Sequence, residues 1–133
     1  MLKEIDKLAW LYVKNKQVLM ARSKGKDIYY LPGGKREVGE SNKEALVREI
    51  HEELSVDLTP NTIEHFNTFK AQADGKAEGV IVKMTCYQAE YTGEIVAASE
   101  IEEVSWANYK DKHKGSAATK LILEHLKEND WID

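Results

Sequence analysis

The sequence is poor in the residues that cross-link or interrupt a chain. Its 133 residues include one cysteine, Cys86, and two prolines, Pro32 and Pro60. A lone cysteine excludes an internal disulfide and a cysteine-based zinc site, so a reducing, cytoplasmic location is expected. The 42% content of hydrophobic residues excludes a disordered chain. The length suits one domain, and we expect residues 1–133 to form a single domain.

Two further absences limit what the chain can bind. No apolar stretch approaches the roughly 20 residues of a membrane span, and no apolar run of signal length follows the charged N-terminus, so no membrane partner is expected. There are 19 Lys and Arg against 23 Asp and Glu, which gives a net charge of -4. Without a positive field, general nucleic-acid binding is not expected. A phosphorylated substrate would therefore need local basic groups or a bound cation.

Apolar segments and turn residues predict an order of strands, helix, strands and helix. Strands are expected at residues 8–13, 18–20, 28–31, 63–73, 80–91 and 104–106. The first two should form a hairpin, and Asp74-Gly75 should turn the chain between the two long strands. Helical spacing recurs near residues 116–128. This order predicts an α/β sandwich around a mixed β-sheet.

A helix near residues 42–55 has the clearest local signals. Ser41 followed by Glu44 fits a capping box, in which each side chain satisfies a backbone amide. Leu46, Ile50 and Leu54 recur every fourth residue and predict one buried stripe.

Three carboxylates share one face of this helix. Glu49, Glu52 and Glu53 are three and four residues apart and border the buried stripe. Like charges at this spacing destabilise a helix, and Arg48 offsets only part of the repulsion. Mg²⁺ would neutralise the carboxylates and could also accept substrate phosphates. The alternative is a solvated acidic helix face, the usual explanation of an isolated cluster.

The surrounding spacing favours the metal site. Five residues separate Gly34 from Glu40, seven more precede Arg48-Glu49-Ile50, and Glu52-Glu53 follow after one residue. This pattern resembles the Nudix box, GX5EX7REUXEEXGU with U aliphatic, except that Ser55 replaces the last glycine. The resemblance implies a Nudix-type α/β/α sandwich in which water cleaves a phosphoanhydride bond. Ser55 should alter only the helix C-terminus, where glycine would relieve left-handed strain.

The resemblance also implies roles for individual residues. Glu49, Glu52 and Glu53 match the metal-binding glutamates, and the carbonyl of Gly33 matches a further ligand. Arg48 matches an arginine that orients these carboxylates. Glu40 matches an acid that supports the loop or assists catalysis.

The resemblance does not identify the acid that takes a proton from the attacking water, because members of the family differ in this residue. Glu100, Glu102 and Glu103 are candidates outside the box, in an expected loop before residues 104–106. We prefer Glu100 and expect the other two to be solvated, although a wholly solvated acidic loop is an equal alternative.

Three residues are candidates for contact with substrate. Arg22 could hold a phosphate with its guanidinium, and Tyr29 or Tyr30 could stack on a nucleobase, with Tyr29 preferred. Gly34 lies at the start of the box, against the expected diphosphate. An ordinary surface arginine and core tyrosines are the alternatives.

The expected function is Mg²⁺-dependent hydrolysis of a nucleoside diphosphate linked to another group, with Mn²⁺ as an alternative ion. A nucleoside triphosphate giving a monophosphate and pyrophosphate is favoured. Hydrolysis of ADP-ribose or a nucleotide sugar, and a non-catalytic nucleotide-binding module, are the alternatives. A homodimer stays open.

Overall fold

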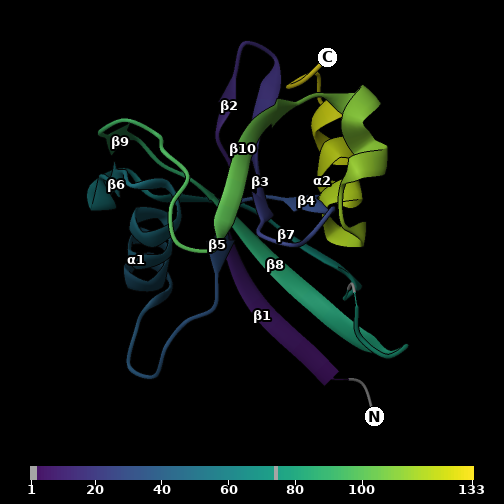
Figure 1. The fold of residues 1–133 in the computed structure, drawn as a ribbon, viewed down its shortest axis with the longest axis horizontal. Helices are drawn as coiled ribbons and strands as arrows, with labels where there is room; N and C mark the ends of the chain where they lie inside the picture. Colours follow the sequence, from purple (N-terminus) through teal and green to yellow (C-terminus); the bar gives the residue numbers. More distant parts are fainter. Residues whose placement is uncertain (1–2, 74) are drawn as a thin grey trace.

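The computed structural model describes residues 3–73 and 75–133, which fold into strands with a helix on either side (Figure 1). In chain order the strands are β1 (Lys3–Trp10), β2 (Val13–Lys14), β3 (Gln17–Ser23), β4 (Tyr29–Tyr30), β5 (Gly33–Gly34), β6 (Asp57–Leu58), β7 (Glu64–Gln72), β8 (Val80–Gln88), β9 (Tyr91–Thr92) and β10 (Ile101–Ala107). The helices are α1 (Asn42–Leu54) and α2 (Ala117–Glu128), with short 3₁₀ turns at Pro60–Thr62 and Tyr109–Lys114.

The strands form a mixed sheet and an antiparallel sheet. The mixed sheet has the order β5-β1-β8-β7, with β1 and β8 parallel and the other pairs antiparallel. The second has the order β10-β3-β2, with β4 also on β3. A two-residue pair joins β6 to β9. The predicted α/β sandwich with a mixed sheet is confirmed.

Side-chain alternation along the strands builds two cores. On β1, Leu8 and Trp10 pack toward α1, while Ala9 packs toward α2. On β3, Leu19 faces α1 and Met20 faces α2. Successive side chains of a strand point to opposite faces, so one layer of strands supports both helices. The two helices consequently lie on opposite sides of the strands (Figure 1).

Both predicted helices are confirmed, and α1 begins as expected. The Ser41 side chain accepts from the Glu44 amide, and the Glu44 side chain accepts from the Ser41 amide. The long strands predicted at 63–73 and 80–91 correspond to β7 and β8, which pair antiparallel. The predicted Asp74-Gly75 turn includes residue 74, which lies outside the described residues.

Two expectations about strands are wrong in detail. The predicted hairpin forms between β2 and β3, but most of the run 8–13 lies outside it, because residues 8–10 belong to β1, which pairs with β8 and β5. The turn at Asn15 and Lys16 reverses the chain there, with φ of 53° and 62°. The strand expected at 104–106 begins earlier, at Ile101, because pairing with β3 extends along the whole segment.

Candidate active site

Two glycines before α1 let the backbone come close to its neighbours. Gly33 and Gly34 form β5 and pair antiparallel with Ala9 and Leu8 of β1. A Cβ atom on Gly33 would clash with the Leu8 carbonyl, and its φ of 151° is rarely adopted by other residues. A Cβ on Gly34 would clash with the Glu49 carboxylate. The backbone of β5 therefore lies directly against the acidic face of α1.

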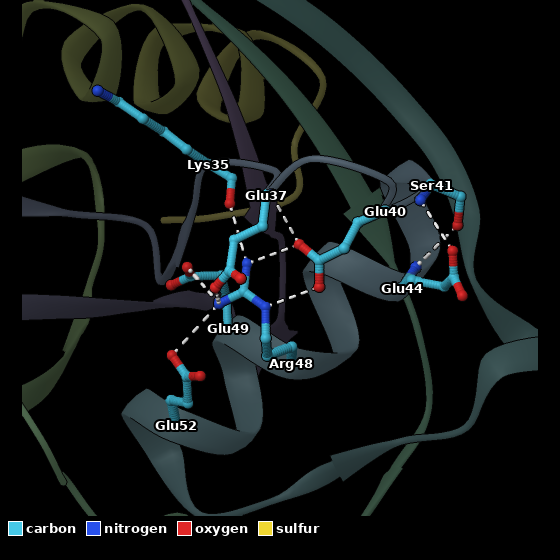
Figure 2. Close-up of polar contacts among 8 residues, drawn as sticks. All are labelled: Lys35, Glu37, Glu40, Ser41, Glu44, Arg48, Glu49 and Glu52. Atoms are coloured by element: carbon cyan, nitrogen blue, oxygen red, sulfur yellow. Dashed lines mark hydrogen bonds and ion pairs between the residues drawn. The ribbon is translucent and has the colours of Figure 1, made fainter.

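Arg48 joins the loop before α1 to the helix itself (Figure 2). Its guanidinium donates two hydrogen bonds to Glu40, from Nε to Oε2 at 2.7 Å and from Nη2 to Oε1 at 2.8 Å. Nη2 also donates to the Lys35 carbonyl at 3.1 Å. Nη1 lies 3.0 Å from Glu49 Oε1 and 3.4 Å from Glu52 Oε2. One side chain thus holds the loop and two of the three acids.

The Arg48–Glu40 pair is charged at neutral pH. Hydrogen bonds from Arg48, and then from the Glu37 amide, lower the pKa of Glu40 to about 2. The same carboxylate raises the pKa of Arg48 further above its usual value. The contact is bidentate, which is the strong geometry for a guanidinium and a carboxylate.

Glu53 is half-buried where α1 meets the backbone of β5. Its Oε1 accepts a hydrogen bond from the Gly33 amide at 3.0 Å. Burial, which outweighs that hydrogen bond, raises the pKa of Glu53 to about 7, and the charges of Glu49, Glu100 and Glu52 add to the effect. Burial likewise raises the pKa of Glu49, against the opposing effect of Arg48. The site therefore gathers more negative charge than its own cations neutralise.

These donors suit a hard divalent cation by their chemistry. Carboxylate oxygens are what Mg²⁺ and Mn²⁺ prefer, and a cation beside Glu53 would remove the cost of burying its charge. Within residues 3–73 and 75–133, no three His, Cys, Asp or Glu side chains already converge as a metal cluster. The Glu52 side chain is 51% exposed, and it lies 3.4 Å from Arg48, farther than Glu40 or Glu49. The fit is thus one of donor type and charge.

The three acids near β10 have different surroundings. Glu102 and Glu103 belong to β10, so their expected place in a loop is wrong; pairing of Glu103 with Arg22 of β3 draws them into the sheet. Glu100 precedes the strand, as expected, and is exposed; Glu102 and Glu103 are exposed, as expected for solvated residues. Its charge contributes to the raised pKa values of Glu53 and Tyr30. Glu100 is therefore the outside acid whose surroundings include the acidic face of α1.

The two residues proposed for substrate contact outside the box lie together. Arg22 and Tyr29 are paired between β3 and β4, and the Arg22 guanidinium lies 5.9 Å from the centre of the Tyr29 ring. The Tyr29 hydroxyl donates to Glu103, while Arg22 lies 3.9 Å from that carboxylate and donates to the Lys26 carbonyl at 3.0 Å. Both side chains thus already make hydrogen bonds or ionic contacts within the protein.

Three neighbours of the acidic face come from outside α1, and two of them, Lys7 and Lys35, are not among the candidates from sequence. Tyr30 hydrogen-bonds to Ser23 and is affected by the charges of Glu53 and Glu100. Lys7 is half-buried on β1, where burial and then Lys35 lower its pKa, while Glu53 acts in the opposite direction. In Figure 2 the Lys35 ammonium points away from Arg48. The sequence held one signal for Lys7: it interrupts the alternating apolar residues of β1. Lysines are rarely buried, so a lysine at such a position is a candidate for a functional role.

Solved structures share this architecture. A MutT NUDIX hydrolase from Burkholderia pseudomallei is 23% identical, with 92% of this chain and 97% of that chain covered and a TM-score of 0.75. A MutT protein from Bacillus halodurans is 25% identical over 96% of this chain and 84% of that chain, with a TM-score of 0.70. A bifunctional NMN adenylyltransferase/ADP ribose pyrophosphatase from Francisella tularensis is 24% identical. The match covers 97% of this chain and 42% of that chain, with a TM-score of 0.68. No curated protein matches the sequence.

The fold is that of a small α/β domain, which the chain shares with these solved structures. The sequence model of the NUDIX domain family matches residues 6–126 of this chain. The chain therefore belongs to this family. It is accordingly a Nudix hydrolase, whose substrates contain a nucleoside diphosphate linked to another group. None of the described helices is long and apolar enough to cross a membrane.

Proposed function

We propose that the protein uses a divalent metal ion to hydrolyse a nucleoside triphosphate to a monophosphate and pyrophosphate. The observation that carries this proposal is the excess negative charge at the end of α1. Glu53 is half-buried beside Glu49 and Glu52, and its pKa is raised to about 7 by desolvation and by its acidic neighbours. Such a cluster is suited to a cation that also binds the phosphates of a substrate.

In this proposal Glu49, Glu52 and Glu53 hold the ion, and the Gly33 carbonyl is a further candidate ligand. When bound, Mg²⁺ or Mn²⁺ would neutralise phosphate oxygens and lower the pKa of a bound water. Arg48 orients Glu49 and Glu52 through its guanidinium, and Glu40 holds Arg48 in place. The Gly33 amide fixes one oxygen of Glu53 at 3.0 Å.

Glu100 is the proposed acceptor of the proton from the attacking water. Its exposed carboxylate lies outside the Arg48 network and acts electrostatically on Glu53 and Tyr30. Among the residues that the structure describes, an acid with this placement makes no hydrogen bond to the proposed ligands of the metal and is free to contact the attacking water. Glu40 is less suited to the role, because its pKa of about 2 leaves it a weak base.

The substrate is the second part of the proposal. Arg22, Tyr29 and Gly34 remain the proposed contacts, with Arg22 directed at a phosphate and Tyr29 at the base. A nucleoside triphosphate is the first candidate, because small members of the Nudix family often act on such substrates. The ADP ribose pyrophosphatase from Francisella tularensis, whose structure contains AMP and a manganese ion, supports ADP-ribose as the second candidate.

A panel of nucleotides with Mg²⁺ or Mn²⁺ tests the proposal. Pyrophosphate released in equal amount to a nucleoside monophosphate would support the first candidate, and AMP with ribose 5-phosphate from ADP-ribose would support the second. The Glu52→Gln/Glu53→Gln double variant is the matched control and should release neither product while remaining folded. Nucleotide binding without turnover in the wild type would overturn hydrolysis and favour a binding module.

A further inference from the structure

Ser55, which ends α1, adopts a backbone conformation that favours glycine. Its φ is 65° and its ψ is 15°, and its amide donates to the His51 carbonyl at 3.0 Å. A side chain in this left-handed region costs free energy that glycine does not pay. Local geometry at the end of α1 therefore gives no reason for serine at this position.

The Ser55 side chain contacts a segment far away in sequence. Its Oγ donates to the Val96 carbonyl at 3.2 Å, and the Val96 amide donates to the Leu54 carbonyl at 2.9 Å. The Ala98 amide donates to the Glu53 carbonyl at 2.9 Å. The last carbonyls of a helix lack partners within the helix, and residues 93–100, which we call the strap, supply them here.

The strap leads directly to Glu100. Figure 1 shows the chain running from β9 past the end of α1 to β10. At the start of the strap, a Cβ on Gly93 would lie 3.6 Å from the Ser55 carbonyl oxygen. At its end, the Glu100 carbonyl accepts from the Lys24 amide at 2.8 Å. Between these two ends, the strap is attached to the end of α1 by the hydrogen bonds of Val96 and Ala98.

We propose that Ser55 is a positioning residue: its hydroxyl tethers the strap to the end of α1 and so holds Glu100 beside the carboxylates of that helix. Ser55 touches neither those carboxylates nor Glu100, and it acts through the Val96 carbonyl. The effect on turnover rests on the proposed function of Glu100. The tether itself does not, because it is a property of the folded chain.

Three substitutions separate the tether from the strain. Ser55→Gly removes both the hydroxyl and the strain, and its Tm should stay within about 2 °C of the wild type because the two effects oppose each other. Ser55→Ala removes the hydroxyl and keeps the strain, so its Tm should fall by about 3–6 °C. Ser55→Asn tolerates the left-handed backbone and keeps a donor, and it should restore the wild-type behaviour.

Amide hydrogen exchange tests the tether without any substrate. In Ser55→Gly and Ser55→Ala, the Val96 and Ala98 amides should exchange about three- to tenfold faster, because a neighbouring hydrogen bond is lost. The Tyr109 amide, which donates to the Asp133 carbonyl at 2.8 Å, serves as a distant control. Unchanged exchange at Val96 and Ala98 in both variants would overturn the proposal.

Turnover tests whether the tether acts through Glu100. We expect both variants to lower kcat by a similar factor of about three to ten, with little change in KM, whatever their Tm. In a Glu100→Gln background, Ser55→Gly should lower kcat no further, because the group it positions is gone. Rates that follow Tm, or equal losses in both backgrounds, would overturn the positioning role. A wild type that hydrolyses no nucleotide would instead refute the proposed function, and exchange would still decide the tether.

Discussion

The two helices are alike in construction and differ in what borders their buried stripes. Each begins after a serine, Ser41 or Ser116, whose side chain accepts from a backbone amide of the first turn. Each buries an apolar face against the strands, centred on Leu46 and Ile50 in α1 and on Ile122 and Leu123 in α2. Beside the stripe of α1 lie carboxylates linked by one guanidinium. We infer that α1 combines packing with chemistry, whereas α2 serves packing.

Two buried ionisable groups show the same contrast. Burial raises the pKa of Cys86, in the core next to α2, to about 12, and no charged group contributes. Burial also raises the pKa of Glu53 to about 7, but there a backbone amide and three other acids contribute. A thiol in an apolar core is inert. A carboxylate crowded by other carboxylates at the edge of a core is a candidate for a functional group.

The largest expected effect follows from removing the charge of Glu53. Glu53→Gln should lower kcat/KM by at least about 10²-fold, because an amide cannot neutralise a metal ion. Its Tm should not fall, since the buried negative charge is lost with little change in shape. Turnover and thermal unfolding of the same preparation provide the measurement. Glu124→Gln on α2, which removes only the ion pair with Lys112 at 3.3 Å, is the control. Near-normal turnover in folded Glu53→Gln would contradict the metal assignment.

A substitution in α2 tests the opposite case, in which packing is lost and the proposed site is left intact. Leu123 is fully buried, and Leu123→Ala should lower the free energy of unfolding by about 2–5 kcal/mol through lost burial and a residual cavity. The kcat of the protein that remains folded should be unchanged, because α2 contributes no proposed ligand. Urea unfolding and assays well below the Tm measure the two quantities. A kcat that falls with stability would show that the two helices are not separable in this way.

Arg48→Lys tests the connection between the loop and α1. A lysine keeps the charge but cannot make the two parallel hydrogen bonds to Glu40 or reach the Lys35 carbonyl at the same time. We expect kcat/KM to fall by about tenfold, with a higher Mg²⁺ concentration needed for half-maximal rate. A titration of rate against Mg²⁺ provides the measurement. A lower rate at unchanged Mg²⁺ dependence would place Arg48 outside the orientation of the carboxylates.

The features that could be predicted from the sequence are those that depend on neighbouring residues in the chain. The capping box of Ser41 and Glu44, the four-residue spacing of the α1 stripe and the glycines before it are all encoded within about 20 residues, and the structure has them at those positions. Left-handed geometry at Ser55 was also expected from the departure in the motif. What its hydroxyl binds was not, because Val96 is 41 residues away.

The rest depended on pairing between distant segments. Parallel pairing of β1 with β8 divides the run that suggested a hairpin, and no local pattern encodes it. After Ile101, β10 continues with two charged residues, Glu102 and Glu103, which hide the strand until its pairing with β3 is known. Tyr29 and Tyr30 form a strand of two residues, too short for a period to show which side chain faces α1.

The smallest expected effect concerns Glu40, which supports the site without belonging to the acidic face of α1. Its pKa is about 2 in the folded protein and 4.5 without these contacts, so the contribution to stability is complete above about pH 5 and is lost as the pH falls toward 2. The Tm difference between wild type and Glu40→Gln, measured with EDTA, should therefore be a few degrees at pH 7 and shrink steadily between pH 4.5 and 2. Glu124→Gln should show no comparable trend, because an exposed ion pair contributes little at any pH. A constant difference down to pH 2 would mean that Glu40 supports the loop by shape alone, and the electrostatic contrast between the two helices would then end at Glu49, Glu52 and Glu53.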